Sequence, residues 1–248
     1  MLPKIEGFVA ALLGALEREA LTRTAADLGR LEQTVLGRAD LRAVLSDTSI
    51  AGPVRGDVVR ELLAGKIDET AARIAVYAAT VAPAQEVAHS WAEAAQVTNV
   101  LLDTGDFVHV PLSLTDARRR VSGFTDALLE AVETPRFAEI EDELFRWART
   151  IDANPGLRRL LLDRDAPVAA RLGATNQLLE GRVAVPTLRL ARYVIEGGRP
   201  RDVVGTLDFL VDYVALARDW RVARVHSARP LDEPSRAGLS ASLHALTG

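Results

Sequence analysis

Residues 137–163 read FAEIEDELFRWARTIDANPGLRRLLLD, and this stretch decides the fold class. Phe137, Ile140, Leu144, Trp147 and Ile151 recur every three or four residues, a spacing that places them on one face of a helix. The pair at 154–155, asparagine then proline, is typical of an N-cap followed by the first helical position, so a second helix begins there. Both signals return along the chain and predict a mostly helical protein.

The other prolines also mark helix starts, and Gly65, Gly181 and Gly198 are placed as helix stops. Two stretches depart from the helical pattern, Asn99–Val110 and Arg221–Ser227, and we expect a short strand in each. The spacing predicts helices near 4–20, 24–37, 39–46, 53–64, 68–81, 83–97, 117–132, 136–153, 155–162, 166–180, 186–197 and 201–218.

The chain repeats itself at a shift of 116 residues without a gap. The shift aligns Leu28 with Leu144 and Tyr77 with Tyr193, together with Leu41-Arg42 on Leu157-Arg158, Leu62-Leu63 on Leu178-Leu179 and Gly65 on Gly181. We interpret this as a tandem duplication, and because short connections favour antiparallel neighbours, the predicted fold is all-α, two tandem six-helix bundles with short β segments in the linker and near the C-terminus. The predicted divisions are a first bundle at 1–97, a linker at 98–116, a second bundle at 117–220, and an exit strand with the start of a truncated C-terminal domain at 221–248.

Composition narrows the function classes. The 248 residues carry a formal net charge of -4, which offers no global field for a phosphate backbone, so no nucleic-acid partner is expected. There is no cysteine, which excludes disulfides and sulfur-based zinc sites. The most apolar stretch, Ile74–Ala84, is too short for a bilayer span of about 20 residues, so no direct membrane insertion is expected.

Chemistry-bearing motifs are sparse. The four histidines have no metal-ligand spacing, no glycine-rich run fits a nucleotide loop, and Ser122-Gly123 lacks the flanking glycine of a nucleophile elbow. The acidic run at 139–143 begins a helix, where carboxylates complement the macrodipole on the solvated face. We therefore predict no catalytic residue, no cofactor and no metal. The alanine-rich helix around Ala71–Ala79 has shallow grooves that suit an amphipathic partner helix, or allow close core packing.

A family resemblance rests on the second half of the chain. The run Ile140–Leu157, followed by Leu160–Asp163, Arg171, Leu178-Leu179 and Gly181, resembles the N-terminal domain of the delta subunit of F-type ATP synthase, whose mitochondrial counterpart is the oligomycin-sensitivity-conferring protein. Glu196–Arg199 is similar to the family's turn before the last bundle helix, and Ala223–Leu231 to its exit strand. Through the duplication, the first half resembles the longer bacterial form, which includes fusions to a b-type subunit.

The resemblance implies a non-catalytic stator subunit in the peripheral stalk, at the cytoplasmic side of the plasma membrane. Its partners would be alpha subunits of the catalytic head and the b-type stalk subunits, so that proton-driven rotation makes ATP. By analogy, partner binding would use the groove between the first and fifth helices of a bundle. On this chain, that groove corresponds to Phe124, Ala127, Leu128, Leu188, Ala191 and Ile195.

The sequence departs from the family pattern in two places. The family continues past the exit strand into a small mixed domain, so the part that holds b-type subunits is expected to be truncated or supplied by another chain. The spacing between copies does not account for Val97–Pro111.

Two alternative functions stay open. An all-helical ligand-responsive regulator would require sequence-specific DNA binding. A small all-helical enzyme would gain thermal stability from a metal or nucleotide.

Overall fold

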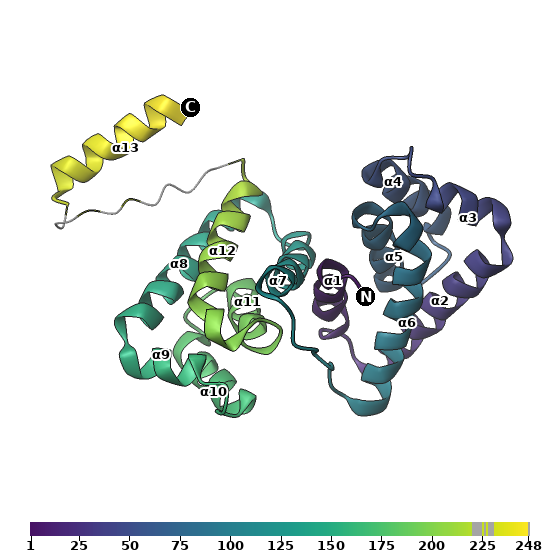
Figure 1. Ribbon diagram of the computed structural model, residues 1–248, viewed down its shortest axis with the longest axis horizontal. Helices are drawn as coiled ribbons and strands as arrows, with labels where there is room; N and C mark the ends of the chain where they lie inside the picture. The colour runs from purple at the N-terminus through teal and green to yellow at the C-terminus, as the bar shows by residue number, and fades with distance from the viewer. Residues whose placement is uncertain (220–224, 226, 228–230, 248) are drawn as a thin grey trace.

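The computed structural model describes residues 1–219, 225, 227 and 231–247, and over these residues it contains helices and no strand (Figure 1). The all-helical prediction is confirmed for this part of the chain. The helices are α1 Pro3–Leu13, α2 Arg18–Gly37, α3 Ala39–Ser46, α4 Gly52–Leu63, α5 Glu69–Val81, η1 Ala84–Glu86, α6 Val87–Thr104, α7 Leu114–Leu129, η2 Thr134–Arg136, α8 Phe137–Ala153, α9 Pro155–Leu162, α10 Val168–Leu179, α11 Val185–Glu196, η3 Pro200–Asp202, α12 Val203–Leu216 and α13 Glu233–Thr247.

The helices form an N-terminal group, α1–α6, and a C-terminal group, α7–α12. In the first, α2 packs against α6 and α4 against α5; in the second, α8 packs against α12 and α10 against α11. The most extensive contact between any two helices joins the groups, because α1 packs along α7 (Figure 1). The two first helices therefore form the centre of the molecule.

The shift of 116 residues seen in the sequence also relates helix boundaries. Helices α9 and α10 begin and end 116 residues after α3 and α4, and η3 lies 116 residues after η1. Helix α12 begins 116 residues after α6. The third to sixth helices of the two groups thus begin at equivalent positions.

A single apolar core runs through both groups. Buried side chains on α1, such as Phe8, and on α7, such as Phe124, belong to the same contiguous cluster as Leu28 and Leu207 of the outer helices. Apolar burial is the main stabilising contribution to folding. Because this burial continues from one group into the other, the contact between α1 and α7 is part of the core.

Several predicted boundaries differ from the structure. The first helix ends at Leu13, where a helix over 4–20 was predicted, because the N–H groups of Ala15 and Leu16 turn back to the carbonyls three residues earlier. Helix α2 consequently starts at Arg18. The connection between groups is only 105–113, since α6 continues to a left-handed Gly105 with φ of 78° and Ser113 caps α7.

The strand predicted within 99–110 is not found. Residues up to Thr104 complete α6, and the following segment is extended without a neighbouring strand. Its alternating pattern arises because Phe107 and His109 are half-buried against helices, whereas Val108 and Val110 are exposed. Alternation alone does not make a strand when no partner supplies the ladder of hydrogen bonds.

The C-terminal segment was predicted as an exit strand. The residues concerned, 221–227, lie mostly outside the described residues. Beyond them, the sequence analysis missed α13, in which Leu239, Leu243 and Leu246 recur at helical spacing. Helix α13 is drawn apart from both groups in Figure 1, and nearly all of its described side chains up to Leu243 are exposed.

Candidate functional site

Two glycines allow α1 and α7 to cross at backbone contact. A Cβ built on Gly7 would lie 1.7 Å from the carbonyl oxygen of Arg120, and one on Gly123 would lie 1.7 Å from the carbonyl oxygen of Lys4. No side chain fits in either place, so glycine is required at both. The two contacts are equivalent under the shift of 116 residues, which extends the repeat to the first helices.

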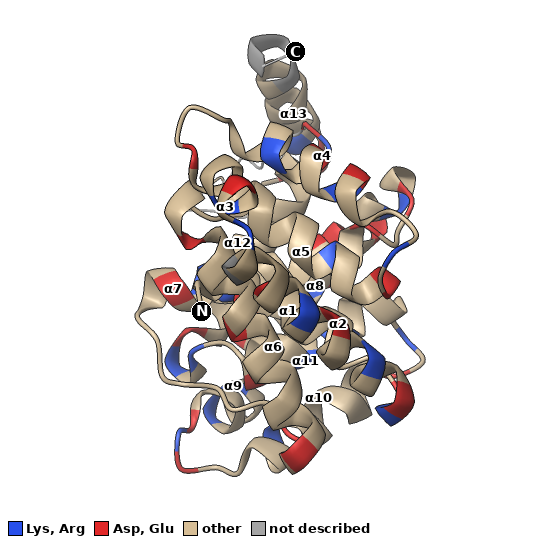
Figure 2. Cartoon of the chain, turned by 90° about the vertical axis from the view of Figure 1, so that its right-hand side faces the viewer, with Lys and Arg blue, Asp and Glu red and all other residues tan. Residues whose placement is uncertain are grey.

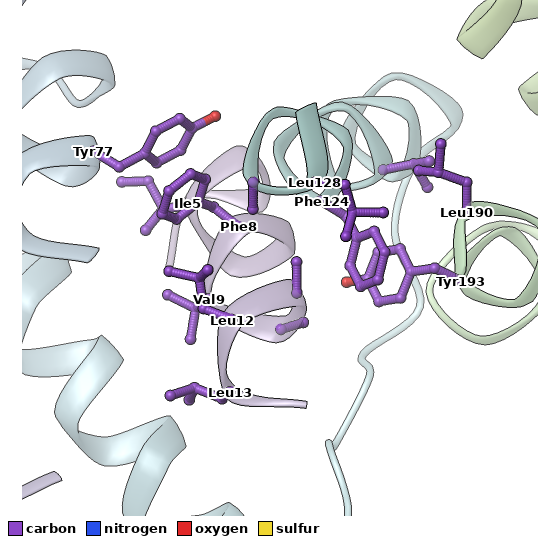
Figure 3. Close-up of a cluster of buried hydrophobic side chains, with 14 of the residues drawn as sticks. Ile5, Phe8, Val9, Leu12, Leu13, Tyr77, Phe124, Leu128, Leu190 and Tyr193 are labelled. Carbon is purple, nitrogen blue, oxygen red and sulfur yellow. The ribbon is translucent and has the colours of Figure 1, made fainter. Parts of the chain in front are cut away.

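Two aromatic pairs flank this crossing in the same way. Phe8 stacks on Tyr77 with ring centroids 3.7 Å apart, and Phe124 stacks on Tyr193 at 3.8 Å (Figure 3). Each pair joins the first helix of a group to its fifth helix. Stacked aromatic rings contribute dispersion and quadrupole attraction beyond the area that they bury.

A polar network closes one side of the crossing. Asp126 on α7 accepts hydrogen bonds from the hydroxyls of Tyr77, at 2.5 Å, and Tyr213, at 2.6 Å, and pairs with Lys4 at 3.2 Å. Burial raises the pKa of both tyrosines, and the carboxylate raises it further. Burial alone would lower the pKa of Lys4, but the charges and hydrogen bonds of Asp126 and Tyr213 together outweigh it, and the pKa is raised.

Glu6 anchors a second polar cluster, beside the connecting segment. It pairs with Arg120 at 2.9 Å and lies 3.5 Å from Nδ1 of His109. Burial acts to raise the pKa of Glu6, but the contact with His109 and the charge of Arg120 lower it overall. Arg120 also donates to the carbonyl of Gly197, so this cluster ties α1 and α7 to the end of α11.

The three consecutive arginines at 118–120 are paired in the structure. Arg118 pairs with Asp202 at 3.0 Å and Arg119 with Asp116 at 3.3 Å. Arg120 is buried. In the view of Figure 2, acidic and basic positions are interspersed over the helices.

The six residues predicted for partner binding fall into two sets. Phe124, which is itself buried, and the half-buried Leu188 line one groove, whereas the other four are buried and do not line it. Ala127 lies one turn beyond Gly123, on the face of α7 that contacts α1. The buried set is Ala127, Leu128, Ala191 and Ile195.

The groove has a volume of about 860 Å³ and runs between α1, α10 and α11 and the segment 101–109. The sequence analysis missed the wall from α1 because it considered each bundle separately. The equivalence of Gly7 with Gly123, and of Phe8 with Phe124, could have indicated that the first helices meet. The residues that line the groove include Ala10, Leu13, Gly14, Leu16, Leu101, Phe107, Val168, Leu172, Val185, Leu188, Arg189, Arg192, Tyr193 and Glu196.

Charged groups stand along the α11 wall of this groove. Burial lowers the pKa of Arg189, whose guanidinium donates to the carbonyl of Ala11 at 2.7 Å. Burial raises the pKa of Glu196, which the charges of Arg192 and His109 partly offset. An apolar groove with cationic groups on one wall suits an amphipathic helix better than a small metabolite.

Two other features, a metal cluster and a membrane-spanning helix, are absent from the described residues. No cluster of three His, Cys, Asp or Glu side chains is arranged to hold a metal ion there. Within the same residues, none of the helices combines the length and apolar character needed to span a bilayer.

The family described as ATP synthase delta (OSCP) subunit matches residues 122–248. The chain belongs to this family. The ATP synthase delta family match begins within α7 and therefore covers the C-terminal helix group.

Long relatives in the ATP synthase delta family extend the similarity to the N-terminal group. ATP synthase subunit delta of Kineococcus radiotolerans is 33% identical over 221 residues, which cover 89% of this chain and 71% of the relative. That of Salinispora tropica is 30% identical over 94% of this chain and 75% of its own length. That of Nocardia farcinica is 30% identical over 98% of this chain and 80% of its own length.

Proposed function

We propose that this chain is a stator subunit of F-type ATP synthase that links the catalytic head to the peripheral stalk at the cytoplasmic face of the plasma membrane. The proposal rests on the family membership. Its role is structural: it resists torque so that proton-driven rotation makes ATP. The continuous core through α1 and α7 supports this role, because two helix groups that share one core transmit force together.

Within this proposal, each helix group is one copy of a six-helix bundle. The first would comprise α1–α6, and the second α7–α12, joined by 105–113. The shared helix boundaries at a shift of 116 residues and the equivalent contacts of Gly7 and Gly123 support the duplication.

The partner on the head would be an alpha subunit. Phe124 and Leu188 remain the predicted residues that a partner helix can reach, since both line the groove. Binding at the other four predicted residues would require α1 or the core to move.

Reconstitution tests the proposal. The full chain is mixed with a catalytic head assembled from alpha and beta subunits of the same organism, and complexes are separated by size-exclusion chromatography. We expect co-elution, and calorimetric titration with a peptide of the alpha N-terminal segment should show saturable binding with a negative heat-capacity change, the mark of apolar burial.

A head whose alpha subunits lack their N-terminal segments is the matched control and should not retain the chain. If the chain fails to associate with the intact head at high micromolar concentration, the stator proposal is wrong.

A further inference from the structure

Two acids on α7 have no counterparts on α1. Under the shift of 116 residues, Asp126 corresponds to Ala10 and Glu130 corresponds to Gly14. The helix backbones are equivalent on both sides of the crossing, but the side chains differ. At these two positions α7 and its C-cap carry carboxylates one helical turn apart, and α1 and its C-cap carry none.

On the side that carries the acids, both carboxylates bind side chains of α5. Asp126 accepts the hydrogen bond of the Tyr77 hydroxyl at 2.5 Å, and Glu130 accepts from the Arg73 guanidinium at 2.8 Å. The first helix of the second group thus supplies a pair of carboxylates to the fifth helix of the first group.

On the other side, the equivalent groups on α11 lack these partners. The side chain of Tyr193 is 3% exposed, and its hydroxyl has no hydrogen-bond partner. Arg189, the counterpart of Arg73, donates to a backbone carbonyl, that of Ala11. A buried hydroxyl without an acceptor is unfavourable, so this site lacks a group that its counterpart has.

The residues around this buried hydroxyl border a groove. Ala10, Gly14, Arg189 and Tyr193 all line the groove of about 860 Å³. Arg192 lines the same wall and adds a second cation. Figure 3 shows Tyr193 between α7 and α11, with its oxygen pointing from α11 toward α1.

We propose that this groove binds an amphipathic helix of a partner subunit that carries two carboxylates one helical turn apart. These carboxylates take, on Tyr193 and Arg189, the places that Asp126 and Glu130 take on Tyr77 and Arg73. Leucine side chains of the groove, such as Leu13, Leu172 and Leu188, receive the apolar face of the helix. The inference rests on the proposed function for the source of the helix, and it specifies the chemistry of that helix.

The same comparison fixes the stoichiometry. On the N-terminal group, the position of the incoming acids is already taken within the chain by Asp126 and Glu130. One partner helix therefore binds each chain, although the chain contains two related helix groups.

The test uses a fluorescent, end-capped helical peptide with a leucine face and two glutamates one turn apart, titrated against the full chain. Its twin carries glutamine at both positions. We expect one peptide per chain, and binding of the twin about tenfold weaker, because hydrogen bonds to charged groups are the stronger ones.

Variants of the chain locate the contact. Arg189→Gln should weaken the diacid peptide about tenfold, whereas Arg73→Gln, the matched change on the closed side, should leave its affinity unchanged. Tyr193→Phe removes only a hydroxyl that has no partner, so the fold is preserved. This variant should weaken the diacid peptide and leave the glutamine twin unaffected.

Three results would overturn the inference: no binding of the diacid peptide, equal affinity for both peptides, or equal effects of the two arginine variants. If the chain still co-elutes with the head in those cases, the stator proposal stands and only the chemistry of the groove is wrong.

Discussion

The N-terminal and C-terminal helix groups use the same helix order but differ in how the fourth helix meets the fifth. A Cβ on Gly52 or Gly56 of α4 would lie 2.1 Å from atoms of Thr80 on α5, so these helices pack closely. Their counterparts on α10 are Val168 and Leu172, and α10 makes less extensive contact with α11. Exchanging small for large residues at one helix pair thus preserves the fold and opens a groove.

A buried arginine on the fourth helix shows the same difference in packing between the two groups. Arg55 donates to the carbonyls of Ala79 and Ala82 at the end of α5, and to that of Ile50 before α4. Its counterpart Arg171 is equally buried, but its Nε and Nη1 atoms have no partner. The closer helix pair satisfies its buried cation, and the more open pair does not.

The largest effect is expected at the crossing that joins the two groups. Gly123→Ala should reduce the free energy of unfolding by about 3 kcal/mol or more, because its Cβ meets a backbone carbonyl that cannot move aside. Urea denaturation measures this loss. The control is Gly29→Ala, on α2 with open space around it, which should stabilise by about 0.5–1 kcal/mol. Similar effects of the two changes would contradict a close crossing.

The second largest effect is expected from substitutions of the two buried arginines. Arg55→Met leaves three carbonyls without donors and should cost about 3 kcal/mol, whereas Arg171→Met should cost about 1 kcal/mol or less, because it removes a cation that is itself incompletely paired. Denaturant unfolding measures both losses, and the slope of unfolding free energy against denaturant concentration should be unchanged. Equal losses would mean that the two helix pairs are packed alike.

A smaller difference in unfolding free energy is expected between substitutions of Tyr77 and Tyr193. Tyr77→Phe removes a hydrogen bond to Asp126 and should cost about 1 kcal/mol, whereas Tyr193→Phe should change stability by less than about 0.5 kcal/mol. Thermal unfolding of both variants in one buffer provides the measurement. A larger loss for Tyr193→Phe would show that its hydroxyl has a partner.

The smallest effect is expected in the pH dependence of the unfolding free energy. Because the folded-state pKa of Glu6 lies below its ordinary value of 4.5, the ion pair contributes stability above that pH and loses it as pH falls through the folded pKa. Unfolding free energies from pH 6 to 3 should fall more steeply in the wild type than in Glu6→Gln, by about 1 kcal/mol or less. Parallel pH profiles would show that Glu6 is not held by its partners.

The sequence predicted what depends on local periodicity and capping. The bounds of α9 were predicted without error, because Pro155 fixes its start and a short apolar face defines its length. The groove depends on long-range packing: its α1 wall is visible only once Gly7 meets Arg120. The strand expected in the linker failed because burial of Phe107 and His109 against helices gives the same alternation as a sheet.

The close approach of Gly7 to residue 120 and of Gly123 to residue 4 has the form of an isologous contact, in which the same patch meets itself across a two-fold axis. In a dimer of identical subunits, every substitution at such a patch appears on both sides at once. Placing both patches on one chain removes that constraint, so one side can hold Asp126 while the other holds Ala10. A single chain that holds both halves of such a contact can therefore present two distinct faces.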